Sequence, residues 1–268
     1  MDILKKALAP ITDKAWKEIS DRSGKIFNKY LTARKFIDIN GPLGMDFGAL
    51  STGRLVVPGD QDKQKLHYGI REILPLLEIR RPFHLDIWEL DNISRGARDA
   101  DLKPLEEAAV DVASFEENCI YYGFDKVNIK GLAGFSDKKV QLPSNIEKLI
   151  LTINNEIIGL EKKGIEGPYT LVLPDSLSSV LVNLSEGYPV MKQLKSILQG
   201  DIIHNHSIND PFLVSTRGGD FELTIGEDLA IGFEGIDEHQ AELYFTESFT
   251  FRVIMPDAIV VFKHDKAA

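Results

Sequence analysis

The stretch from Leu243 to Met255 most restricts how this chain can fold, because it alternates between apolar and polar residues over an unusual length for one strand. One face carries the apolar side chains Leu243, Phe245, Phe249, Phe251, Val253 and Met255. The opposite face is mostly polar, apart from Tyr244 and Ile254. A strand this long spans a large distance. We therefore expect it to connect distant regions of the molecule.

Shorter strands accompany it near the C-terminus, whereas most helices come earlier in the chain. The strands are FLVS (212–215), FELTI (221–225), LAIGF (229–233) and AIVVFK (258–263), with a buried strand in GPYTLVLP (167–174). Helices are expected from the N-cap Thr12 to Leu31, from Pro104 to Gly123, from a capping box at 144–147 to Gly164, over 176–184 and over 189–198. Helical and sheet regions are separated instead of alternating, so the predicted class is α+β.

Two further segments predict strands. GRLVVPGDQDKQKLHYG (53–69) reads as two short strands joined by a polar turn at 59–62. Isolated two-stranded ribbons are marginally stable in water, so we expect this hairpin to protrude and lean on a neighbour. FHLDIW (83–88) alternates like a strand with one apolar face, and LDNISRGARDADL (90–102) is expected to be a loop.

The glycines in RGGDFELTIGEDLAIGF (217–233) pose a choice between a ligand-binding loop and sheet punctuated by turns. The segment lacks the glycine spacing of a phosphate-binding loop, and no Gly-x-Gly-x-x-Gly opens a helix elsewhere in the chain. Glycine takes the positive φ that tight turns require. We therefore interpret Gly-Gly-Asp and Gly-Glu-Asp as hairpin turns.

The remaining candidates for chemistry are isolated. His204 and His206 lack the third and fourth ligands that a zinc site needs. Cys119 falls within an apolar helix face, where a thiol is usually inert. The doublets at 106–107 and 116–117 read as the solvated face of the same helix. Glu247 interrupts an apolar strand face and is either a catalytic acid or, the favoured interpretation, the buried partner of an arginine. We predict no catalytic residue and no metal site.

Charge and cysteine content narrow the partners and the compartment. The formal net charge is -10, and the Lys and Arg residues are scattered, which argues against a nucleic-acid partner. One cysteine excludes an internal disulfide framework and suits a reducing compartment. The first residues do not resemble a signal peptide, and no apolar run could span a bilayer. We expect a cytoplasmic protein that does not contact a membrane.

Several blocks together resemble one family. They are MDILKKALAPITDKAW, ARKFIDINGPLG, FHLDIWELDNISRGA, GIEGPYTLVL, EGYPV, RGGDFELTIGEDLAIGF and FTESFTFRV. In this order, over residues 1 to 262, they resemble the encapsulins, the shell proteins of bacterial and archaeal nanocompartments. The chain departs from the family at Met45, where relatives commonly carry tryptophan. This departure concerns the packing of the N-terminal arm.

The resemblance implies a tailed-phage major capsid protein-like fold and a shell protein that is not an enzyme. By position, residues 1–50 are the N-terminal helix and arm, 51–69 the E-loop, 70–130 and 218–268 the P-domain, and 131–217 the A-domain. The resemblance also implies self-assembly of about sixty copies into the smallest closed icosahedral shell. In the family the E-loop pairs with the adjacent subunit.

The resemblance further implies a cargo enzyme, either a ferritin-like protein or a dye-decolourising peroxidase, with the associated roles in iron storage and oxidative stress. The C-terminal peptide of the cargo docks on the inner wall of the shell as an extended chain. The matching residues are Phe27, Tyr30, Leu31, Arg34, Ile37, Asp38, Asp228, Leu229, Ala230 and Ile231. For Phe27, Leu31 and Ile231, membership of an ordinary core is the alternative.

Two smaller sites follow from the same resemblance. A turn formed by Ser185, Glu186, Gly187, Tyr188 and Pro189 is expected to line a fivefold pore, where a ring of Glu186 carboxylates favours cations. Arg80 and Trp88 match positions where flavin is found in the family, and an exposed tryptophan can stack on its ring. No cofactor is required.

Two other functions stay open at this point. A phage or prophage major capsid protein has the same fold but packages DNA. A peptidase is the less favoured alternative, with Glu247 as its acid.

Overall fold

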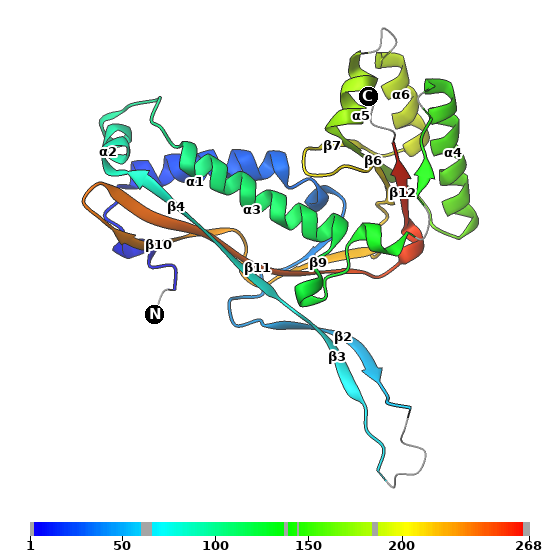
Figure 1. Cartoon of the computed structure of the whole chain (residues 1–268), viewed down its shortest axis with the longest axis horizontal. Helices are drawn as coiled ribbons and strands as arrows, with labels where there is room; N and C mark the ends of the chain where they lie inside the picture. Colours follow the sequence, from blue (N-terminus) through cyan, green and yellow to red (C-terminus); the bar gives the residue numbers. More distant parts are fainter. Residues whose placement is uncertain (1–2, 60–65, 137–138, 144, 184–186, 265–268) are drawn as a thin grey trace.

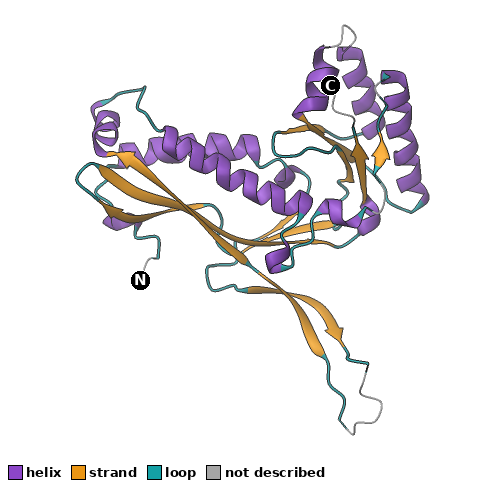
Figure 2. Ribbon diagram, viewed as in Figure 1, coloured by secondary structure: helices purple, strands orange, loops and turns teal. Residues whose placement is uncertain are grey.

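The computed structural model describes residues 3–59, 66–136, 139–143, 145–183 and 187–264. Figure 1 shows an elongated molecule in which two helices lie along a long sheet, a second group of helices surrounds a second sheet, and a hairpin projects from the middle. Helices and strands occupy separate regions (Figure 2), which confirms the α+β class.

The first sheet is organised around one long strand, as predicted. β11 (Gln240–Val253) pairs along one edge with β4 (Leu77–Asp86), and along the other with β10 (Ala230–Ile236) and then β9 (Phe221–Ile225). β1 (Asp38–Asn40) adds to β9 in parallel. The face of β11 that we expected to be polar is also covered, since Thr246, Ser248 and Thr250 are buried.

The interpretation of Gly-Glu-Asp as a hairpin turn is wrong. β9 and β10 do not pair with each other, because both run antiparallel to β11 along the same edge. Residues 226–229 join them without reversing the chain. The Gly226 N–H donates to the carbonyl of Ser248, and the Ser248 N–H donates to the carbonyl of Glu227, which keeps the segment attached to β11. It is an irregularity within one long strand pair.

Gly-Gly-Asp is not a hairpin turn either. It connects β8 (Phe212–Ser215) of the second sheet to β9 of the first, and these strands are not paired. The backbone does require glycine here, because φ is +87° at Gly218 and +80° at Gly219. The expected positive φ values are therefore confirmed, but they serve a crossing between sheets.

Two long helices lie on the first sheet. α1 (Asp13–Tyr30) begins where Thr12 accepts a hydrogen bond from the Ala15 N–H, as predicted. α3 (Lys103–Tyr122) has proline in its first turn and ends at Gly123, also as predicted. The apolar faces of both helices and of the sheet form one core, which includes Ile19, Leu105 and Phe245.

The region after β4 differs from the prediction. The strand begins at Leu77 and ends at Asp86, and Ile87 starts α2 (Ile87–Arg95), a helix within the predicted strand and loop. The Asp86 carboxylate accepts hydrogen bonds from the N–H groups of Trp88 and Glu89, so it caps the new helix. Gly96 ends this helix with a φ of +106°.

The second sheet carries the other helices. Its strands, in spatial order, are β5 (Val140–Gln141), β12 (Ile259–Lys263), β8, β6 (Tyr169–Pro174) and β7 (Ile202–Asn205). Its helices are α4 (Ile146–Lys162), α5 (Asp175–Asn183) and α6 (Gly187–Leu198). Asn145 caps α4, and Ser144 lies outside the described residues. β12 belongs to this sheet although its residues fall within the range predicted for the P-domain, and the predicted domain division stays a prediction.

A hairpin is present, but its second strand is not where the sequence predicted it. β2 (Ala49–Val56) and β3 (Ile70–Pro75) pair antiparallel, and Figure 1 shows them extending away from both sheets. The predicted segment ended at Gly69, whereas residues 66–69 form no strand and β3 begins at Ile70. Of the predicted turn, residues 60–62 lie outside the described residues. The short 3-10 helices are η1 (Lys6–Leu8), η2 (Ala33–Lys35), η3 (Asp125–Val127), η4 (Leu132–Phe135) and η5 (Pro256–Ala258).

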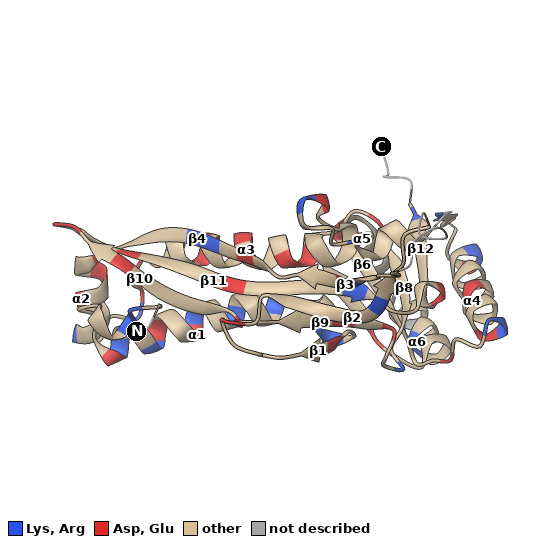
Figure 3. Cartoon of the chain, turned by 90° about the horizontal axis from the view of Figure 1, so that it is seen from below, with Lys and Arg blue, Asp and Glu red and all other residues tan. Residues whose placement is uncertain are grey.

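Charged residues of both signs are interspersed along α1 and α4, whereas the charged residues of α3 are acidic except for Lys103 (Figure 3). No helix in the described part of the chain has the length and apolarity that crossing a bilayer demands.

Candidate functional site

The hairpin and the residues next to its strands carry apolar side chains that are exposed in the described part of the chain. Its exposed apolar side chains are 47–71% accessible and comprise Leu55, Val56, Val57, Leu66, Tyr68, Ile70 and Ile73. β2 and β3 form a separate two-stranded sheet. Many exposed apolar side chains on one projecting ribbon are typical of an interaction surface.

A groove of about 300 Å³ lies between α1 and β10. We call it the α1–β10 groove, and its lining residues are Leu4, Lys6, Ser20, Ser23, Gly24, Phe27, Leu229, Ala230, Ile231 and Phe245. Phe27 and Phe245 meet edge to face at 5.3 Å between ring centroids. Ile231 pairs with Phe245 across the two strands, so its side chain lies on the same face. An apolar floor with few charged groups suits apolar side chains of a peptide.

The structure brings together only part of the predicted cargo-peptide set. Phe27, Leu229, Ala230 and Ile231 line the α1–β10 groove, and all four are half-buried. Leu31 and Ile37 are buried, and Tyr30 packs against the ring of His206 at 5.5 Å. The alternative of an ordinary core role therefore describes Leu31 better than Phe27 or Ile231.

The charged members of that set already have partners within the chain. The Arg34 guanidinium donates to Glu116 and Asp228, each at 2.9 Å, and to Glu247. The Asp38 carboxylate accepts a hydrogen bond from the Gly219 N–H at 2.6 Å. Both side chains therefore hold the fold together where the chain passes from α1 to the sheet.

Arg34 is the centre of a buried ionic cluster that the sequence analysis missed in part. Glu116 and Glu117 were expected on a solvated helix face, but both have no exposed surface. The correction has a simple cause: the two acids follow Val112 and Ala113 by one helical turn, at the spacing of the buried face of α3. The favoured interpretation of Glu247 is confirmed, because it is buried and paired with Arg34.

One arginine cannot neutralise three carboxylates. Burial raises the pKa of Glu247 well above its usual range, and the charge of Glu116 raises it further. Burial opposes the charge on Arg34, but the hydrogen bond and charge of Glu116 raise its pKa above the ordinary value. Glu247 therefore takes up a proton more readily than an exposed glutamate does, and Arg34 stays charged.

Glu117 forms the other half of the cluster and connects the two sheets. Its carboxyl group accepts hydrogen bonds from the Thr32 hydroxyl at 2.6 Å, the Ala33 N–H at 2.9 Å and the Asn205 amide at 2.6 Å. Asn205 is the last residue of β7 in the second sheet. Burial raises the pKa of Glu117 to about 7, although these hydrogen bonds lower it.

This pKa predicts a stability that falls as pH rises. Below pH 4.5 both the folded and the unfolded chain hold the Glu117 proton; between pH 4.5 and about 7 the unfolded chain loses it first, so unfolding becomes easier. The full loss is about 3 kcal/mol above that range. We expect Glu117→Gln to reduce the change of the urea-unfolding midpoint with pH between pH 4.5 and 8. The exposed acid Glu107 on the same helix is the control, and equal pH slopes for Glu117→Gln and Glu107→Gln would contradict the assignment.

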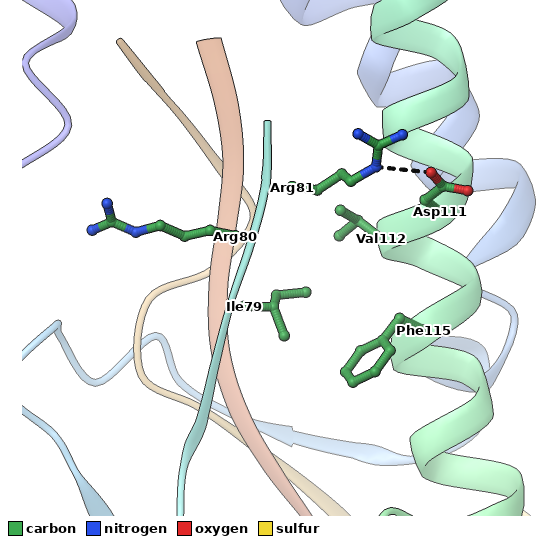
Figure 4. A pocket seen from close by; sticks show the side chains of 6 residues that line it. All are labelled: Ile79, Arg80, Arg81, Asp111, Val112 and Phe115. Atoms are coloured by element: carbon green, nitrogen blue, oxygen red, sulfur yellow. Dashed lines mark hydrogen bonds and ion pairs between the residues drawn. The ribbon is translucent and has the colours of Figure 1, made fainter. Parts of the chain in front are cut away.

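A larger open hollow lies between β4 and α3. It measures about 470 Å³ and is lined by Ile79, Arg80, Arg81, Asp111, Val112 and Phe115. Figure 4 shows Ile79 facing Val112 and Phe115, with Arg81 bonded to Asp111 at the rim and Arg80 pointing away. The sequence did not indicate this hollow, because its walls come from two elements whose relative placement no local pattern encodes.

Within one chain, Arg80 and Trp88 lie apart, and the flavin role stays a prediction. Arg80 stacks over the ring of Tyr244 at 4.7 Å, whereas Trp88 lies on α2 beside Arg95. The strand from Arg80 to Asp86 separates them by roughly 20 Å at the usual rise of β structure. Trp88 is 66% exposed.

The predicted pore residues are only partly described. Ser185 and Glu186 lie outside the described residues. Gly187, Tyr188 and Pro189 begin α6, so the expected turn does not extend as far as Pro189. The pore role stays a prediction.

The remaining candidates, His206 and Cys119, are engaged or buried within the fold. His206 bonds to Asp175 at 2.8 Å, and the residues that the structure describes contain no group of three or more metal-ligating side chains. Cys119 is buried, and burial raises the pKa of its thiol to about 12. Such a thiol is a poor nucleophile at neutral pH.

Comparison with known proteins assigns this arrangement to a family. The family model described as "Encapsulating protein for peroxidase" matches residues 1–250. A type 1 encapsulin shell protein from Rhodococcus erythropolis is 35% identical over 262 residues, which cover 97% of this chain and 99% of the relative.

Two solved structures share the fold. A virus-like particle from Pyrococcus furiosus has a TM-score of 0.66 at 16% identity and covers 92% of this chain and 98% of that chain. The capsid of Myoviridae Phage XM1 has a TM-score of 0.51 at 12% identity and covers 88% and 92%. The expected tailed-phage major capsid protein-like fold is confirmed.

Proposed function

The chain belongs to the encapsulin family of shell proteins, and from this membership we propose that about sixty copies close into an icosahedral compartment around a cargo enzyme. Capsid-like assembly is the property that the named relatives share. The family role is structural, and we propose that the chain itself catalyses no reaction. We place the compartment in the cytoplasm.

The observation that carries this proposal is the uncovered hairpin on a capsid-type fold. An apolar ribbon this exposed gains stability only when another surface covers it. In a closed shell every copy meets the same neighbours, so one ribbon per chain can be covered in every subunit. We propose that β2 and β3 contact the adjacent subunit.

We propose the α1–β10 groove as the cargo-docking site. A ferritin-like protein or a dye-decolourising peroxidase would present its C-terminal peptide in extended form, with apolar side chains directed into the groove. Phe27, Ile231 and Phe245 supply the apolar walls. Asp228, the ion-pair partner of Arg34, precedes the groove residue Leu229 in the chain.

The docking site is tested by a substitution on β10 and a matched control. We expect Ile231→Glu to reduce captured cargo about tenfold or more, because a charge in the groove opposes burial of an apolar peptide. Ile236→Glu, on the same strand but exposed outside the groove, keeps normal capture. The shell is co-expressed with a ferritin-like protein or a dye-decolourising peroxidase that carries its own C-terminal peptide, and protease-protected cargo per particle is measured. Equal cargo in both variants would contradict the site.

Two further features belong to the proposal. We propose that residues 185–189 surround a fivefold pore, where Glu186 carboxylates admit cations. We also propose that assembly needs no flavin or metal. A capsid that packages DNA is the competing function, and recovery of nuclease-protected DNA from purified particles would favour it over a cargo shell.

A further inference from the structure

The N-terminal segment occupies one end of the α1–β10 groove. The Phe233 N–H donates to the Leu4 carbonyl at 2.8 Å, and the Tyr244 hydroxyl donates to the Ile3 carbonyl at 3.3 Å. Leu4 and Lys6 are groove-lining residues, and the Lys6 ammonium lies over the Trp16 ring at 4.6 Å. Figure 1 shows this segment beside β10.

The bond from Phe233 to Leu4 identifies an edge at which a strand can add. The inner edge of β10 pairs with β11, so an N–H of β10 that reaches Leu4 points to the outer edge. Backbone groups two residues apart along a strand point the same way, so Ile231 presents its N–H and carbonyl to that edge too. The outer edge therefore runs along the groove from Ile231 to Phe233.

Few contacts hold the segment in place. Ile3 and Leu8 are more than half exposed, and only Leu4 among residues 3–8 is half-buried. Lys5 has a φ of +50°, a conformation uncommon for residues other than glycine. A segment with little buried apolar surface opens at low cost.

We propose that residues 3–8 are a built-in occupant of the outer edge of β10, which an extended peptide displaces by adding to that edge as a strand. This inference rests on the proposed docking function and specifies how docking occurs. The peptide that fits has an apolar side chain where Leu4 now lies, and it takes the Phe233 N–H as its main-chain donor. Main-chain bonds at an edge supply affinity, and the groove selects the side chain.

The experiment uses a synthetic peptide with the sequence of residues 1–11, labelled at its C-terminus. Its anisotropy is measured against the full chain and against a variant that lacks residues 2–8. We expect binding to the truncated variant at least about tenfold tighter than to the full chain, because a tethered segment competes at millimolar effective concentration. Equal binding to both proteins, or binding to neither, overturns the proposal.

A second pair of variants keeps the test decisive if the truncated chain fails to fold. In the full chain, Leu4→Asp opens the edge and binds the peptide, whereas Leu8→Asp, on the exposed side of the same segment, behaves like the unchanged chain. Equal binding by these two variants also overturns the proposal.

Displacement is tested with cargo. We expect shells without residues 2–8 to capture at least as much cargo as unchanged shells, and a clear decrease overturns the exchange. If neither shell captures cargo while the synthetic peptide still binds the truncated variant, the docking function fails but the occupancy of the edge stands.

Discussion

We expect the double variant Val56→Lys, Ile70→Glu to remain a monomer of 30.0 kDa under conditions in which the unchanged chain forms particles. The two residues face each other across β2 and β3, so the new side chains form a cross-strand ion pair that supports the hairpin itself. The apolar surface, however, is replaced by charges that a neighbouring subunit would have to desolvate. Light scattering coupled to size exclusion measures the mass.

Loss of assembly has to come from the hairpin and not from general misfolding. Leu8→Lys replaces an apolar side chain that is 71% exposed on the N-terminal segment by a charged one, as each of the two hairpin substitutions does. We expect it to assemble normally. Full-size particles formed by the hairpin variant would contradict the assignment of β2 and β3 as an assembly surface.

The second large effect concerns Arg34. Replacing it by methionine leaves Glu116 and Glu247 buried without a cation, and removing one partner of a buried ionic group typically costs about 3–5 kcal/mol. We expect a loss of this size in the free energy of unfolding. The measurement uses urea denaturation in the monomeric hairpin variant, so that assembly does not contribute.

Two comparisons isolate the cause. Arg81→Met breaks an ion pair with Asp111 in which both side chains are about half exposed, and it should cost no more than about 1 kcal/mol. Adding Glu116→Gln and Glu247→Gln to Arg34→Met should restore most of the lost stability, because neither fully buried glutamate is then present and the remaining carboxylate, Asp228, is about half exposed. If Arg34→Met lowers the free energy of unfolding no more than Arg81→Met does, water reaches the Arg34 cluster and the assignment of a buried ionic cluster is wrong.

The sequence predicted those elements whose signal is local. The alternation in β11, the Thr12 cap of α1 and the glycine that ends α3 each lie within a few residues, and all three are confirmed. The existence of the hairpin was also predictable from its polar turn between apolar runs, but its second strand begins at Ile70, after the predicted segment. These patterns specify single elements without regard to the rest of the fold.

The incorrect predictions concern residues whose conformation or burial depends on contacts with other parts of the fold. Ile87 and Trp88 continue the apolar–polar alternation of β4, which predicted a strand. Asp86, however, caps a helix at this point, and the capping residue decides the structure. Glu116 and Glu117 looked solvated by composition, although their spacing from Val112 and Ala113 places them on the buried face. Acidic residues that continue the spacing of an apolar helix face indicate a buried ionic cluster, and this pattern is present in the sequence of α3.

The candidate site was predictable only through the family resemblance. That resemblance selected Phe27 and Ile231, which do lie together on the α1–β10 groove. It also selected Arg34 and Asp38, which the structure uses for internal contacts. Sequence reasoning could not foresee the role of Leu4, because its contact with Phe233 joins opposite ends of the chain.

The proposed function depends on self-assembly of this chain into a closed shell. Its most direct test is the particle mass of the purified chain alone, measured by mass photometry and checked by negative-stain microscopy. We predict uniform closed shells of about sixty subunits. A well-folded chain that stays monomeric across all protein concentrations and ionic strengths would contradict the account.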